Sequence, residues 1–81
     1  MRVRVHVTLK PGVLDPAGKA VQGGLISLGF SEVNEVRIGK YFELDVEPVP
    51  QLRERVEEMC RKLLANTVIE RFHVELPESA S

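Results

Sequence analysis

Two short basic corners are the places in this sequence where residue types and spacing suggest binding chemistry. In each corner a glycine stands beside a lysine, and an exposed glycine amide next to an ammonium group can hold an anion. Two ordinary tight turns would use the same residue types, so both interpretations stay open. The residues of the two corners are Lys10, Pro11, Gly12, Arg37, Gly39 and Lys40.

Other reactive side chains do not form a pattern that supports catalysis. His6 and His73 fall on outward positions of predicted strands, without the helical spacing of metal ligands. Cys60, the only cysteine, lies on an apolar helical stripe, which favours a small core residue over a nucleophile. No glycine-rich phosphate motif is present. We therefore expect no catalytic, cofactor-binding or metal-binding residue in the chain.

Length and charge limit the possible classes of protein. A chain of 81 residues with 11 basic and 12 acidic side chains predicts one domain, which we place at residues 1–76, followed by a frayed tail at 77–81. The net charge of -1 gives no attraction for nucleic acid or an anionic membrane. The sequence contains no stretch long and apolar enough to span a membrane. With a single cysteine, we expect a cytoplasmic protein.

The first half of the sequence predicts a strand followed by a helix. Residues 2–9 alternate between apolar and polar side chains, the period of a strand with one buried face. Asp15 suits a helix N-cap and Pro16 the first helical position, and apolar residues then recur at helical spacing as far as Leu28. Three glycines inside this helix predict close approach, either of the sheet or of another chain.

The second half predicts a hairpin, a helix and a last strand. Residues 36–38 and 42–46 alternate on either side of Gly39 and Lys40, which suits two strands joined by a type II′ turn. A helical pattern begins after Pro50, and residues 68–76 form a final alternating run. The order β-α-β-β-α-β predicts an α+β two-layer sandwich of the ferredoxin-like kind, an antiparallel sheet with two helices on one face.

This topology also predicts a core and a strand register. Strands 2–9 and 42–46 should be antiparallel neighbours whose outward residues carry opposite charge, with paired residue numbers adding to about 49. Arg4 would then face Asp45, and His6 would face Glu43. The predicted core consists of Val3, Val5, Val7, Leu25, Leu28, Leu44, Val56, Leu63, Phe72 and Val74.

Four blocks of the sequence carry a resemblance to a known family. They read "V.V.LKPGVLDPAGKAV", "VRIGKYFELDVE", "RVEEMCRKLLAN.VIE" and "F.VE", in this order from Val5 to Glu75. Together they resemble PurS, the small subunit of phosphoribosylformylglycinamidine (FGAM) synthase. The resemblance covers nearly the whole chain, from Met1 to about Leu76.

The resemblance implies a subunit without catalytic residues of its own, within a glutamine-dependent, ATP-using ligase of purine biosynthesis. It implies a dimer or higher homo-oligomer that bridges a large synthetase subunit and a glutaminase subunit and supports ammonia transfer between them. The six corner residues would then be candidates for partner binding, because bridging contacts concentrate in a few anchors.

Two other functions share the same order of elements. An ACT-like regulatory module would bind a small molecule at a dimer interface, although it is normally attached to an enzyme by a linker. An acylphosphatase needs an arginine in the loop after the first strand, where this chain has Lys10. RNA binding is disfavoured because the outward strand positions are charged rather than aromatic.

Overall fold

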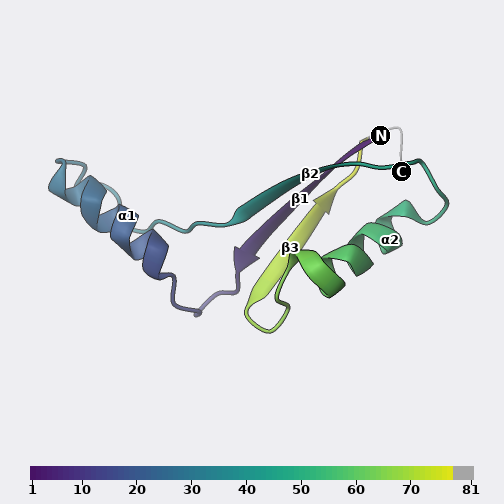
Figure 1. Cartoon of the computed structure of the whole chain (residues 1–81). Coiled ribbons are helices and arrows are strands. Elements are labelled where there is room, and N and C mark those ends of the chain that lie inside the picture. The colour runs from purple at the N-terminus through teal and green to yellow at the C-terminus, as the bar shows by residue number, and fades with distance from the viewer. Residues whose placement is uncertain (78–81) are drawn as a thin grey trace.

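The computed structural model describes residues 1–77 and confirms the α+β class (Figure 1). The last four residues of the predicted tail lie outside the described part. None of the helices in residues 1–77 is long and apolar enough to cross a membrane. The elements in chain order are β1 (Arg2–Leu9), α1 (Pro16–Ser27), β2 (Lys40–Asp45), α2 (Leu52–Met59), the π-helical turn η1 (Cys60–Leu64) and β3 (Glu70–Glu75).

The sheet is antiparallel, with strand order β2-β1-β3. As the sequence predicted, β1 is central and pairs with β2, the strand that contains Leu44. The predicted strand at residues 36–38 was wrong: in the described chain these residues are irregular, so the hairpin does not form. Gly39 also lacks the positive φ that a type II′ turn requires. The backbone of this segment bonds instead to the region around α1, as described below.

The predicted register was off by two residues. Arg4 pairs with Glu43 and Arg2 with Asp45, so the residue numbers add to 47 rather than 49. The N-terminus fixes this register, because Met1 and Val46 exchange backbone hydrogen bonds of 2.6 and 2.9 Å. A shift of two keeps every side chain on its predicted face. Opposite charges still meet, since Arg2 Nη1 lies 3.0 Å from Glu43 Oε2.

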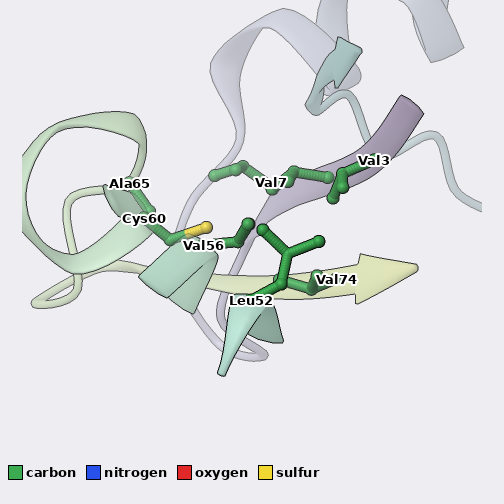
Figure 2. Close-up of a cluster of buried hydrophobic side chains, with 8 residues drawn as sticks. Val3, Val7, Leu52, Val56, Cys60, Ala65 and Val74 are labelled. Atoms are coloured by element: carbon green, nitrogen blue, oxygen red, sulfur yellow. The ribbon is translucent and has the colours of Figure 1, made fainter. Parts of the chain in front are cut away.

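The core lies between the sheet and α2 (Figure 2). The inward valines of β1 are fully buried. Leu52, Val56 and Cys60 recur every four residues along α2 and η1, and this spacing places all three on the side that packs against the sheet. The buried residues are Val3, Val5, Val7, Leu52, Val56, Cys60, Ala65 and Val74.

The π-helical turn explains one incorrect core prediction. The amide of Ala65 donates to the carbonyl of Cys60 at 2.9 Å, a bond that spans five residues instead of four. The wider turn rotates the following side chains, so Ala65 is buried and Leu63 is 85% exposed. Leu44 and Phe72 lie at the edge of the core and are only partly buried.

α1 is not part of this packed unit. Only α2 covers the sheet of its own chain, whereas α1 stands beyond the end of the sheet where β1 finishes and β2 begins (Figure 1). Leu28 is therefore 76% exposed, and Leu25 lies outside the core, contrary to prediction. The radius of gyration is 16.1 Å, whereas a compact domain of this length has about 12 Å. Below, residues 13–39, which carry α1 out and back, are called the arm.

Candidate functional site

The two basic corners lie at the same end of the sheet. β1 ends where β2 and β3 begin, with Val7 opposite Lys40 and Leu9 opposite Glu70. The first corner is tied to the start of β3 by a 2.8 Å hydrogen bond from the amide of Lys10 to the carbonyl of Ile69. The sequence alone left open whether the corners were neighbours. The structure places them together at the base of the arm.

Pro11 and Gly12 form an exposed tight turn in the first corner. The amide of Val13 donates to the carbonyl of Lys10 at 3.1 Å, which closes the turn. Gly12 has φ +85, in the left-handed region that glycine adopts without strain. The side chain of Lys10 is exposed and forms no ion pair or hydrogen bond within residues 1–77. Its ammonium group is therefore available to a partner.

Arg37 fastens the returning end of the arm to the first corner. Its Nη2 atom donates to the carbonyls of Leu9 and Lys10, at 2.8 and 3.3 Å. Nη1 lies 3.8 Å from Glu35 Oε1. A guanidinium engaged in this way holds the backbone in place. Arg37 thus has a structural role in the free chain that its position in the sequence did not reveal.

Lys40 and Gly39 also serve the fold. The Lys40 ammonium lies 3.7 Å from Glu70 Oε2 and donates to the carbonyl of Leu64 at 3.4 Å, which connects β2 to β3 and η1. A Cβ atom on Gly39 would collide with the carbonyl oxygen of Val7 and would lie 2.9 Å from Thr8 Cγ2. Glycine at this position therefore permits the close approach of β2 to β1.

Asp15 is the central residue of the base of the arm, and the sequence predicted only half of its role. As predicted, it caps α1, with Oδ1 accepting from the amide of Gly18 at 2.8 Å. Oδ2 also accepts from the amide of Ile38 at 3.0 Å, which joins the two ends of the arm. These two bonds, that from Ile38 first, lower the pKa of Asp15. No local pattern could have revealed a partner 23 residues away.

Gly18 allows the helix and the returning segment to touch. A Cβ atom there would collide with the carbonyl oxygen of Val36. Further along, Gln22 Nε2 donates to the carbonyl of Asn34 at 2.8 Å. The arm is therefore a built unit in which α1 and residues 34–38 hold each other, while Asp15 and Arg37 set its direction.

The remaining sequence candidates stand apart from this base. His6 and His73 are cross-strand neighbours on the open face of the sheet, with Nε2 atoms 3.4 and 3.8 Å from Glu75 Oε1. Residues 1–77 contain no group of three ligands placed to hold a metal ion. Cys60 is buried beneath α2, and this burial raises the pKa of its thiol. The base of the arm offers an exposed ammonium group and a rigid turn, features that suit recognition of another surface.

Comparison with known proteins decides the family. The family model for PurS, described as phosphoribosylformylglycinamidine (FGAM) synthase, matches residues 2–78. The chain belongs to the PurS family. The PurS subunit of Bacillus subtilis is 54% identical over 78 residues, which cover 95% of this chain and 93% of the relative.

Solved PurS structures have the same fold. The Bacillus subtilis PurS crystal structure aligns with a TM-score of 0.88 and 54% identity, covering 95% of this chain and 98% of that one. A chain in the structure of PurLQS from Thermotoga maritima aligns with a TM-score of 0.80 and 29% identity, covering 91% and 93%. PurS relatives are subunits of FGAM synthase by name, so the comparisons favour a subunit over the ACT-like module.

Proposed function

We propose that this chain is the non-catalytic small subunit of a multi-subunit FGAM synthase. In this role it bridges a large synthetase subunit, which uses ATP, and a glutaminase subunit, and it supports the transfer of ammonia between them. The observation that carries the proposal is the match, over 91% of this chain, to a chain of PurLQS, whose name joins three components. Residues 1–76 act as one unit in this proposal, in the cytoplasm.

The shape of the chain supports a bridging role. The arm and the packed unit of sheet and α2 offer two separated surfaces on one elongated molecule, with extents of 49 × 26 × 15 Å. The base of the arm is stiffened by Asp15 and Arg37, so little conformational entropy is lost when a partner binds it. Lys10, Pro11 and Gly12 form the exposed part of this base and are our first candidates for partner contact. The contacts of Arg37, Gly39 and Lys40 within the chain hold the backbone of this base in place.

A homo-oligomer, at least a dimer, belongs to the same proposal. The exposed side chains include many large apolar ones, among them Leu14, Leu28 and Leu63, at 67%, 76% and 85% exposure. We infer that a second copy of the chain covers part of this exposed apolar surface.

Reconstitution tests the bridging role. The chain is mixed with its synthetase and glutaminase partners, and the complex is followed by size-exclusion chromatography with light scattering. We expect a complex of all three components, and no complex of the two large subunits when this chain is left out. The purified chain should hydrolyse neither glutamine nor ATP. Stable association of the two large subunits in its absence would refute the bridge.

A further inference from the structure

The face of the sheet opposite α2 carries three ring side chains in a row. The strand register places Tyr41 and His73 on either side of His6, so that each strand supplies one ring. The ring centroids of His6 and Tyr41 are 5.0 Å apart, and those of His6 and His73 are 6.3 Å apart. Below, these three residues are called the ring row.

The observed register, rather than the predicted one, creates the ring row. The prediction placed Glu43 opposite His6, whereas the structure places Tyr41 there. Neighbouring ring planes are tilted by 42° and 32°, so neither pair is stacked face to face. The side chains of His6 and His73 are 44% and 71% exposed, and Tyr41 is 49% exposed. Exposed tyrosine and histidine rings of this kind can stack a nucleobase.

The acidic side chains of this face all lie on one side of the ring row, toward the start of β1. They are Glu43, Asp45 and Glu75. In the register they stand opposite Arg2 and Arg4, and the amino terminus lies 3.6 Å from Asp45 Oδ1. This side of the row therefore has no excess of positive charge and does not favour an anion.

The other side of the ring row, toward the arm, is basic and open. Its outward residues are Thr8 and Arg71, which pair directly, and Lys10, which follows Thr8 at the spacing of one sheet face. Neither Arg71 nor Lys10 forms an ion pair or a side-chain hydrogen bond within residues 1–77. Beside Thr8 stands Gly39, where a Cβ atom would lie 2.9 Å from Thr8 Cγ2. Glycine at this position keeps the surface next to Thr8 clear.

Charges at the base of the arm do not cancel this basic side. Arg37 is matched by Glu35, whose Oε1 atom lies 3.8 Å from Nη1. The carboxylate of Asp15 is taken up by two backbone amides. The positive charge that remains without a partner in residues 1–77 beside the ring row comes from Arg71 and Lys10.

We propose that this face binds a nucleotide, with the base stacked on the ring row and the phosphate held by Arg71 and Thr8. Successive outward residues of a strand are about 6.6 Å apart, a distance that the sugar of a nucleotide bridges. A guanidinium and a hydroxyl both donate hydrogen bonds to phosphate oxygens. The single row of rings and the carboxylates beyond it suit one nucleotide rather than a nucleic-acid strand. The proposal goes beyond the bridging role and does not depend on it.

Nuclear magnetic resonance of the full-length chain tests the proposal. His6 and His73 are its only histidines, so their ring protons report on the row directly. Adenosine 5′-monophosphate is titrated at constant pH and ionic strength, and we expect saturable shifts of both histidine signals. Adenosine and ribose 5-phosphate each supply half of the ligand, and both should bind at least about fivefold more weakly.

Substitutions separate the stacking from the charge. Arg71→Ala should weaken binding about tenfold, the effect of one lost charge-assisted hydrogen bond. Arg61→Ala, at an exposed position of η1 in the other layer, is the matched control and should leave binding unchanged. Tyr41→Phe keeps the ring and should retain binding, whereas Tyr41→Ser should weaken it at least about fivefold. Circular dichroism spectra check that every variant is folded.

Four results would overturn the proposal. The first is the absence of a saturable shift at millimolar adenosine 5′-monophosphate. The second is equal affinity for ribose 5-phosphate, which would leave an anion site without a base. The third is equal binding by Arg71→Ala and Arg61→Ala. The fourth is tighter binding of a decaadenylate, which would make the face a nucleic-acid surface. None of these results bears on the reconstitution of the synthase, so the two proposals fail separately.

Discussion

Replacing Val56 by alanine tests whether α2 holds the sheet as described. Val56 has 0% exposure and packs among the valines of β1 (Figure 2). The change removes two buried carbons at about 0.8 kcal/mol each, and the cavity left behind adds to the loss. Alanine returns roughly 0.5 kcal/mol through its higher helix propensity. We therefore expect the free energy of unfolding to fall by about 2 kcal/mol.

This loss is large for so small a domain. A chain of 81 residues has a total stability of about 4–12 kcal/mol, and about 2 kcal/mol lowers the melting temperature of such a domain by roughly 8–16 °C. Urea denaturation followed by circular dichroism measures the change, at one fixed protein concentration because association contributes to stability. Val68→Ala is the matched control, since Val68 is 80% exposed. Equal stability of the two variants would contradict the packing of α2 on the sheet.

Further predictions concern the base of the arm. Gly18→Ala should destabilise the chain because its Cβ atom would collide with the carbonyl oxygen of Val36, whereas Gly23→Ala should not. Thermal melts and near-ultraviolet spectra compare the two variants. Equal melting temperatures would contradict the close contact between Gly18 and Val36. Folding lowers the pKa of Asp15, so the stability it contributes is present above its ordinary value of 3.8 and is lost as the pH falls through the lower folded value. Asp15→Asn should flatten the dependence of stability on pH in that acid range, and an unchanged dependence would refute the role of the two hydrogen bonds. Lys10→Glu should weaken assembly with the partner subunits, more at low salt, while Lys19→Glu should have a smaller effect. Dissociation constants measured at two salt concentrations test this difference. Equal effects of the two substitutions would contradict the role of Lys10 as an anchor.

Sequence periodicity predicted the sheet well where side chains alternate against one packed layer. The alternation of Val3, Val5 and Val7 identified β1 and its buried face, and the predicted order of elements placed β2 beside it. The register was wrong by two residues because the side-chain pattern is unchanged by such a shift. The backbone hydrogen bonds between Met1 and Val46 fix which of the two registers forms. Because they join backbone atoms, no side-chain pattern in the sequence reveals them.

The errors around the arm have one physical origin. Val36 and Ile38 alternate as the residues of a strand would, and Leu28 lies on the apolar side of a helix. The sequence does not show whether the surface against which such residues pack belongs to the same chain. Contacts of Asp15 with Ile38 and of Gly18 with Val36 take this segment away from the sheet. Leu63 was mispredicted for a different reason, since one π-helical turn rotates it outward.

Candidate site residues were predicted by type, and their roles follow from geometry. Glycine beside lysine indicated two corners, and the structure brings both corners to one end of the sheet. The three basic residues nevertheless differ in role. Arg37 and Lys40 form hydrogen bonds and ion pairs within the chain, whereas the side chain of Lys10 remains exposed. Partner binding at these residues stays a prediction, which the Lys10→Glu assay addresses.

The most direct test of the account compares two nitrogen sources in the reconstituted synthase. FGAM formation is measured with the synthetase and glutaminase subunits, with and without this chain, using either glutamine or free ammonia. A bridge that supports ammonia transfer predicts that leaving out the chain abolishes glutamine-dependent synthesis and reduces ammonia-dependent synthesis far less. Glutamine-dependent synthesis at an equal rate without the chain would contradict the central claim.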